Sequence, residues 1–159
     1  MEQTAENIQR TSVVIEARDW LGTPYHHMAD IKGVGVDCGM LLIKVFNNVG
    51  LIDFVDPRPY AHDWHMHQDE ERYLKIVENL CGEMVPNSEW KGERGILPGD
   101  VLVWSFGRTF SHGGICTKWP YFVHAYWPSK IVEEPNWNGT MFADPWRIMR
   151  VYDFWRHRK

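Results

Sequence analysis

A cysteine at the start of an apolar-striped helix is the feature that most constrains how this chain can fold. The stretch from Trp20 to Gly50 opens with a glycine-punctuated loop that leads into Cys38, and apolar residues then follow at helical spacing. These are Leu41, Leu42, Val45, Phe46 and Val49. Asp37 is a natural N-cap, and Gly50 is a stop signal just past the stripe. We therefore predict a half-buried helix that begins at Cys38 and ends before Gly50.

The sequence leaves two interpretations of Cys38 open. A thiol at a helix N-terminus faces unsatisfied N–H groups and the positive end of the helix dipole, which favour the nucleophilic thiolate. A free cysteine is also among the residue types most often buried, so Cys38 could equally be a core thiol on the apolar stripe. A second cysteine, Cys81, lies on the stripe of another predicted helix and is expected to be a small core residue.

Composition limits the class of protein. A chain of 159 residues with 44% hydrophobic and 24% charged residues is typical of one soluble domain. The net charge of −4 provides no basic excess for nucleic acid or an anionic membrane. Three cysteines without a CxxC pair indicate reduced thiols. The N-terminal residues carry no signal-peptide pattern and no apolar run reaches spanning length, so we expect a product that is cytoplasmic as synthesised.

The order of periodic segments predicts the fold class. An amphipathic helix is expected at about 4–21, and its apolar face comprises Ile8, Val13, Val14, Ala17, Trp20 and Leu21. A second amphipathic helix is expected after Asp69, and its apolar stripe comprises Tyr73, Leu74, Val77, Leu80, Cys81 and Met84. Residues 85–95 read as a loop. Strands are then expected at 101–106, 112–117, 121–126, 131–134 and 148–155. Helices followed by consecutive hairpin-length strands indicate an α+β fold with an antiparallel sheet, in one domain over 1–159.

Three histidines, His62, His65 and His67, lie within six residues of one another. Imidazole is the commonest transition-metal ligand, so a zinc or copper site is conceivable there. The segment lacks paired cysteines and the HxxxH spacing of a helical site, and a solvated polar loop is the default interpretation. We therefore predict no metal and no cofactor.

Two further histidines, His112 and His124, fall on adjacent predicted strands. A cysteine nucleophile needs a base within hydrogen-bond reach and a third group that orients the base. If the strands pair, the two imidazoles can meet on one face with the Cys38 helix packed against it, His112 as general base and acid and His124 fixing its tautomer. Gly113 and Gly114 would leave room for a substrate backbone.

The order of these motifs resembles the NlpC-type family of bacterial cell-wall cysteine peptidases, which have a papain-like fold. The family pattern is G-x-P-Y, then D-C at a helix start, P-G-D before a strand, H-x-G-I on the next strand and H-A on the one after. The matching residues are Gly22-Thr23-Pro24-Tyr25, Asp37-Cys38, Pro98-Gly99-Asp100, His112-Gly113-Gly114-Ile115 and His124-Ala125. The resemblance spans roughly residues 14–126, and an ordered set of motifs is far more specific than any one of them.

The resemblance implies roles for individual residues. Cys38 would be the nucleophile, His112 the base and His124 the orienting residue. The hydroxyl of Tyr25 and the backbone N–H of Cys38 would form the oxyanion hole, and Asp37 would meet a free amine of the substrate in addition to capping the helix.

The chain also departs from the family pattern. Gly39 and Met40 follow the cysteine where the family usually has Ser then Gly, which questions the pocket shape near the nucleophile. The segment at about 53–90 is outside the common peptidase core. It looks like the insertion of phage-encoded members, which are associated with tails or tail-like particles.

The leading hypothesis is a cysteine peptidase that cuts murein peptides, at the bond between the side-chain carboxyl of D-glutamate and the diamino acid. The bond and the murein partner come from the resemblance alone. Three alternatives stay open: a phage-tail or tail-assembly component with weak or lost activity, a thiol acyltransferase or amidase on the same scaffold, and, more distantly, a metal hydrolase built on His62, His65 and His67.

Overall fold

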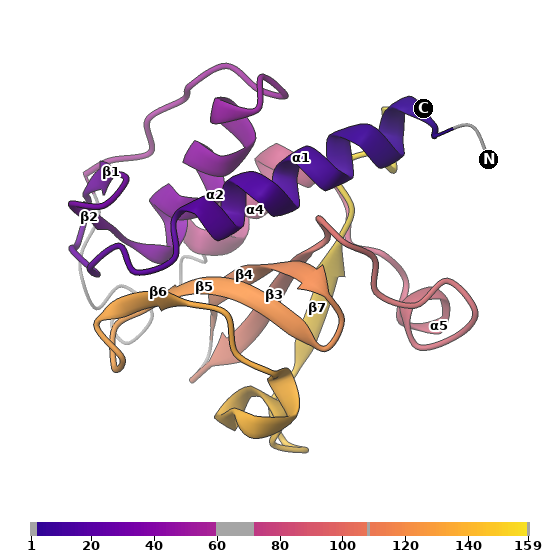
Figure 1. Cartoon of the computed structure of the whole chain (residues 1–159). Helices are drawn as coiled ribbons and strands as arrows, with labels where there is room; N and C mark the ends of the chain where they lie inside the picture. The colour runs from indigo at the N-terminus through magenta and orange to yellow at the C-terminus, as the bar shows by residue number, and fades with distance from the viewer. Residues whose placement is uncertain (1–2, 60–71, 108, 159) are drawn as a thin grey trace.

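Five strands form an antiparallel sheet in the order β6-β5-β4-β3-β7 in the computed structural model, which describes residues 3–59, 72–107 and 109–158 (Figure 1). The strands are β3 (Val101–Phe106), β4 (Thr109–Lys118), β5 (Tyr121–Tyr126), β6 (Ile131–Glu133) and β7 (Met149–Tyr152). The expected α+β fold with an antiparallel sheet is confirmed. Three predicted strands differ in length: β4 spans 109–118 where 112–117 was expected, β6 ends one residue before the expected 134, and β7 is shorter than the expected 148–155. A hairpin of β1 (Asp30–Ile31) and β2 (Gly35–Val36) was not predicted.

Helices α1 (Ala5–Asp19), α2 (Cys38–Asn48) and α4 (Arg72–Cys81) lie on one side of the sheet (Figure 1). The 3-10 helices η1 (Trp137–Gly139) and η2 (Met141–Ala143) lie on the other side, and the short helix α5 (Asn87–Trp90) interrupts the segment expected to be a loop. Within the described ranges, no helix combines the length and apolarity that a membrane span requires.

The start and end of α2 follow the sequence signals. The helix begins at Cys38, and the Asp37 carboxylate accepts the backbone N–H of Met40 at 2.9 Å, which satisfies one of the otherwise unpaired first-turn donors. Gly50, just beyond the helix, has a φ of 77°, a left-handed conformation that glycine adopts without steric strain. The predicted helix and both of its boundary residues are confirmed.

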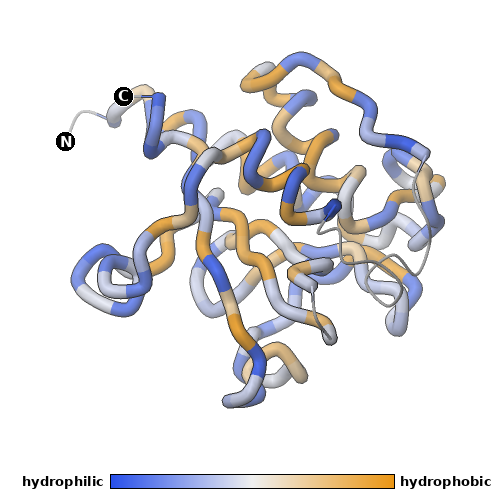
Figure 2. The backbone as a smooth tube through the Cα atoms, turned by 180° about the vertical axis from the view of Figure 1, so that it is seen from behind, coloured by the Kyte–Doolittle hydropathy of each residue, from blue (hydrophilic) through white to orange (hydrophobic). Residues whose placement is uncertain are grey.

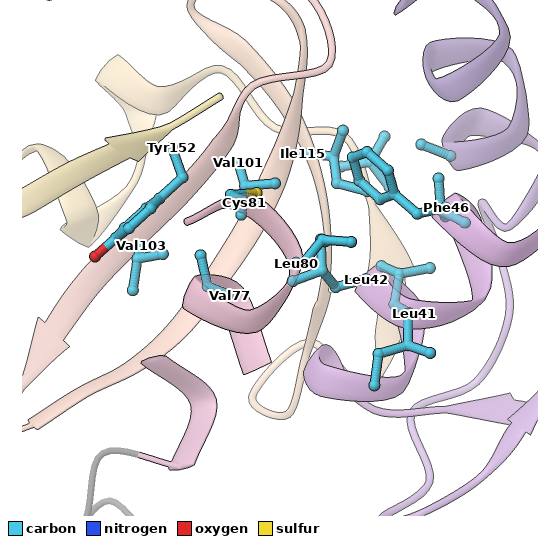
Figure 3. Packing of buried hydrophobic residues seen from close by; sticks show 14 of the residues in the cluster. Leu41, Leu42, Phe46, Val77, Leu80, Cys81, Val101, Val103, Ile115 and Tyr152 are labelled. Carbon is cyan, nitrogen blue, oxygen red and sulfur yellow. The ribbon is translucent and has the colours of Figure 1, made fainter. Parts of the chain in front are cut away.

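The core has two parts because side chains alternate between the faces of the sheet. On the helix side, Val101 and Val103 of β3 join apolar residues of α1, α2 and α4, and Figure 3 shows several of these side chains pointing toward one another. On the other side, Leu102 and Trp104 join a second cluster that includes Phe142 of η2. Figure 2 shows the hydrophobic stretches along the strands and α2, and mostly hydrophilic residues around α5.

The buried face of α1 differs from the predicted one. Ile8 is 51% exposed and Leu21 is 41% exposed, whereas Arg10 is only 5% exposed. Arg10 is buried because its guanidinium donates to two buried carboxylates, that of Asp100 at 3.1 Å and that of Asp153 at 2.8 Å. Inclusion of Ile8 and Leu21 in the core face was therefore wrong. Ile8 lies on the side of the helix opposite the buried residues, and Leu21 lies beyond the end of the helix.

Helix α4 buries most of the predicted stripe, including Cys81, whose exposure is 0%. The assignment of Cys81 as a core thiol is confirmed. Met84 lies beyond the end of the helix and is 37% exposed, so its inclusion in the stripe was wrong. Asp69, predicted to start this helix, and His62, His65 and His67 lie outside the described residues.

The space beside Gly113 and Gly114 is filled by other parts of the protein, so these glycines leave no room for a substrate backbone. A Cβ built on Gly113 would lie only 2.2 Å from the carbonyl oxygen of Leu102 and 2.7 Å from the hydroxyl of Tyr73. A Cβ on Gly114 would lie 2.6 Å from the carbonyl oxygen of Val123. The expectation that these glycines make room for substrate is therefore wrong.

Replacing Gly113 with alanine is expected to destabilise the protein by about 1–3 kcal/mol or more, because backbone atoms of a central strand cannot move away from the new methyl group. The control is Gly139→Ala, because a Cβ at Gly139 meets no atom within 4 Å. Equilibrium urea unfolding of both variants measures the effect. Equal stability of the two variants would contradict the packing role of Gly113.

Candidate active site

Cys38 occupies the first turn of α2 and is half-buried against the main core. The residue before it, Asp37, is 1% exposed, and its two carboxylate oxygens accept the backbone N–H groups of Met40 at 2.9 Å and Met28 at 2.7 Å. Asp37 thus holds the loop before β1 and the start of α2 together. Its role as N-cap is confirmed, and its contact with a substrate amine stays a prediction.

The thiol of Cys38 is not a thiolate by virtue of its helix position. Burial raises its pKa above the ordinary value, and the neighbouring Asp37 carboxylate raises it further. Hydrogen bonds from the backbone N–H groups of Gly39 and Cys38 lower the pKa, as expected of a helix N-terminus, but burial outweighs them. The helix start therefore acts in the expected direction, but burial outweighs it, so a thiolate at Cys38 requires a base that takes the proton.

Tyr25 lies close enough to Cys38 for the two groups to interact electrostatically. The loop that carries it is fixed by a hydrogen bond from its backbone N–H to the carbonyl of Lys130 at 2.9 Å. Burial raises the pKa of the Tyr25 hydroxyl above its ordinary value, and the nearby Cys38 and Asp37 raise it further. The hydroxyl therefore keeps its proton and can act as a hydrogen-bond donor beside the thiol.

The two predicted histidines meet. The Nε2 atom of His112 lies 2.8 Å from Nδ1 of His124, and Nε2 of His124 lies 2.9 Å from Oε1 of Glu133. His124 on β5 stands directly opposite Glu133 on β6. The predicted meeting of the imidazoles is confirmed, and the structure adds a carboxylate that the sequence analysis missed.

Aromatic rings enclose the histidine pair. Tyr126 stacks on His124 with ring centroids 4.9 Å apart and lies 5.3 Å from His112. Phe142 of η2 stacks on His112 at 5.4 Å, and Trp104 stacks on it at 6.2 Å. His112 and His124 are accordingly 8% and 1% exposed. Water has little access to the hydrogen bond between the rings, which strengthens it.

These aromatic contacts belong to the second core cluster, on the sheet face opposite the body of α2. The expectation that the Cys38 helix packs against the face on which the imidazoles meet was therefore wrong. His112 and Ile115 point to opposite faces of β4, and Ile115 belongs to the cluster on the side of α2. Tyr73 links the two regions. Its hydroxyl lies against Gly113, the neighbour of His112, and it interacts electrostatically with Cys38 and Asp37. The pairing of Cys38 with His112 stays a prediction.

The structure resolves the doubt raised by the residues after the cysteine. Gly39 is buried, and Met40 is fully buried in the main core cluster. The Met40 side chain therefore fills core volume in the first turn of α2 and does not protrude into a substrate pocket. Of the residues missed by sequence analysis, Tyr126 and Glu133 lie within two strand positions of a predicted histidine or directly across from it, so strand register could have identified them.

No group of three or more histidine, cysteine or acidic side chains among residues 3–59, 72–107 and 109–158 is arranged to hold a metal ion. The three closely spaced histidines of the metal alternative are outside these ranges.

The chain has the papain-like α+β fold of NlpC/P60 domains. Its structure is similar to NlpC2 from Trichomonas vaginalis, with a TM-score of 0.63 and 14% identity, over 92% of this chain and 47% of that one. It is also similar to the NlpC/p60 domain of the peptidoglycan hydrolase SagA, with a TM-score of 0.57 and 19% identity, over 91% of this chain and 98% of that one. RipB, a peptidoglycan hydrolase from Mycobacterium tuberculosis, gives a TM-score of 0.58 and 17% identity, over 97% of this chain and 68% of that one.

No protein-family model and no curated protein matches the chain by sequence. At identities of 14% to 19%, the structural likeness defines the fold, and the chain spans about half the length of the first of these structures.

Proposed function

We propose that this protein is a cysteine peptidase that hydrolyses amide bonds in bacterial cell-wall peptides. The observation that carries the proposal is the buried, hydrogen-bonded pair of His112 and His124 on β4 and β5, two strands that each contact the helix beginning at Cys38. The fold supports it, because the solved structures that share it include domains named as peptidoglycan hydrolases.

In the proposed mechanism, His112 takes the proton of the Cys38 thiol on its Nδ1 atom, since Nε2 is engaged with His124. The thiolate attacks the carbonyl carbon of the scissile amide, and the oxyanion receives hydrogen bonds from the Tyr25 hydroxyl and the Cys38 backbone N–H. The intermediate collapses, the leaving amine takes the proton from His112, and a thioester forms on Cys38. Water, deprotonated by His112, then releases the carboxylic acid and restores the thiol.

The experiment is digestion of purified murein and of soluble murein peptides, with Cys38→Ala as the matched control for contaminating hydrolases. Mass spectrometry of the released fragments identifies the bond that is cut. The proposal specifies the bond between the D-glutamate side-chain carboxyl and the diamino acid, so new ends at another amide would correct that specificity. Release of identical fragments by wild type and Cys38→Ala would refute the proposal.

The same assay separates the alternatives. Turnover of simple thioesters or amides without release from murein would favour an acyltransferase or amidase on this scaffold. A structural role in a tail or tail-like particle would be favoured if wild type and Cys38→Ala were equally inert toward every substrate and the protein co-purified with particles. Carriage in such a particle is compatible with the peptidase proposal.

A further inference from the structure

The histidine pair continues into a third hydrogen-bonded group, Glu133. Strand β6 lies at the edge of the sheet, and its pairing with β5 sets Glu133 directly opposite His124. The two contacts, 2.8 Å from His112 to His124 and 2.9 Å from His124 to Glu133, use both ring nitrogens of His124. A single line of hydrogen bonds therefore runs from β6 through β5 to β4.

The direction of each hydrogen bond in this line follows from the acceptor at its end. The hydrogen bond from His124 holds the pKa of Glu133 below its usual range, so Glu133 is a carboxylate and can only accept. Nε2 of His124 must then carry a proton. Burial lowers the pKa of His124 against the opposing effect of Glu133, so the ring is neutral and its Nδ1 accepts. Nε2 of His112 is accordingly the donor.

We propose that Glu133 is a positioning residue that fixes His112 in the tautomer with an unprotonated Nδ1, acting through His124. This inference rests on the proposed function in one respect, the use of His112 as the base for Cys38. A neutral imidazole carries one ring proton, and with that proton on Nε2 the Nδ1 lone pair can accept the thiol proton. The carboxylate also stabilises the positive charge that the two rings share once that proton arrives.

Glutamine at position 133 removes this directionality while keeping the size of the side chain. Its amide can accept from Nε2 of His124 or donate to it. When it donates, the line reverses: Nδ1 of His124 donates to His112, and the His112 proton moves to Nδ1, where the ring cannot act as the base. Glu134→Gln is the matched control, because Glu134 is the next residue and carries the same charge, but it pairs with Arg18 of α1 at 3.0 Å.

The other ionisable groups around the site do not explain a change that is seen in the Glu133 variant alone, because they either stay neutral where histidine titrates or are present in every variant. Burial raises the pKa values of three tyrosines near it: Tyr25 in the loop before β1, Tyr73 on α4 and Tyr126 on β5. Burial likewise raises the pKa of Cys38 on α2. The charged groups that act on these side chains are Asp37, Arg147 and Glu133 itself, which raises the pKa of Tyr126 further above the range in which it could ionise. A change confined to the Glu133 variant therefore reports on the line of hydrogen bonds.

The test is the rate of Cys38 alkylation by iodoacetamide, measured by peptide mass spectrometry from about pH 4 to about pH 9. Removing a negative charge beside the rings disfavours the imidazolium, so Glu133→Gln is expected to lower the acid midpoint of the profile by about one pH unit. The mixed tautomers are expected to lower the plateau rate about twofold or more, because an even mixture leaves about half of the His112 rings able to accept the proton. Glu134→Gln should leave both quantities unchanged, and Glu133→Asp should recover part of the plateau.

The tautomers can also be observed without any reaction. In two-dimensional NMR of the ¹⁵N-labelled imidazoles at neutral pH, wild type should show both His112 and His124 protonated at Nε2, and Glu133→Gln should show a mixture. An alkylation profile for Glu133→Gln that overlays wild type would overturn the proposal. So would protonation of either wild-type ring at Nδ1, a measurement that stands even if the variant does not fold.

Failure of this inference and failure of the proposed function are distinguishable. If Glu133→Gln shifts the alkylation profile while wild type releases nothing from murein, Glu133 retains its positioning role and the cell-wall substrate is refuted. If wild type cleaves murein and Glu133→Gln matches it in rate, pH profile and tautomer, the peptidase proposal stands and the positioning role is refuted.

Discussion

Alkylation of Cys38 is expected to slow about 100-fold or more at neutral pH when His112 is replaced with alanine. Burial and the Asp37 carboxylate raise the pKa of the Cys38 thiol, so the thiolate is scarce unless a base accepts the proton. A positioned base contributes at least that factor in comparable reactions. Iodoacetamide labelling followed by peptide mass spectrometry measures the rate at each pH.

The sign of the pH dependence provides a second test. In wild type, the rate should rise to a plateau below the ordinary thiol pKa range, because His112 takes the proton. In His112→Ala, the rate should keep rising with pH above that range, as expected of a buried thiol that titrates alone. Cys81 and Cys116 are 0% exposed and serve as unreactive internal controls. Equal rates in wild type and His112→Ala would exclude an activated Cys38–His112 pair.

Replacing Asp100 with alanine is expected to destabilise the protein by about 3–5 kcal/mol. The loss of this buried carboxylate would leave the buried guanidinium of Arg10 and the half-buried guanidinium of Arg94 without one of the two carboxylates that they share. Asp100 is fully buried, and it accepts from Arg10 at 3.1 Å, from Arg94 at 2.9 Å and from the backbone N–H of Leu97 at 2.8 Å. Equilibrium urea unfolding, followed by tryptophan fluorescence, measures the loss.

Glu134→Gln is the control for this change, since it breaks an ion pair at the surface with Arg18, whose side chain is 47% exposed. Pairs of that kind contribute little to stability. A loss of less than about 1 kcal/mol in Asp100→Ala would contradict the account of the buried network. In that case, the P-G-D motif that contains Asp100 would need an explanation other than the anchoring of α1 to the sheet.

Features determined by neighbouring residues in the chain could be predicted from the sequence. The start of α2 at Cys38 follows from a capping aspartate and an apolar spacing, and β3 and β5 follow from short runs of β-branched and aromatic residues between turns. Each signal depends on contacts within a few residues, which a sequence displays directly.

The errors concern interactions between segments that are distant in the sequence. Periodicity could not show that Arg10 is buried, because its two carboxylate partners lie 90 and 143 residues away in the sequence. The helix start at Cys38 favours thiolate through a local effect, whereas the burial that outweighs it comes from packing. Glu133 required the register of β5 and β6, which the turn between Tyr126 and Ile131 sets.

The position of Tyr73 limits which substitutions α4 can accept. It belongs to α4, its ring is 1% exposed and interacts electrostatically with Cys38, and its hydroxyl lies against Gly113. A substitution on this helix therefore changes the surroundings of the nucleophile as well as the core. The residues that pack α4 against the sheet are therefore constrained by the surroundings of Cys38 as well as by the core.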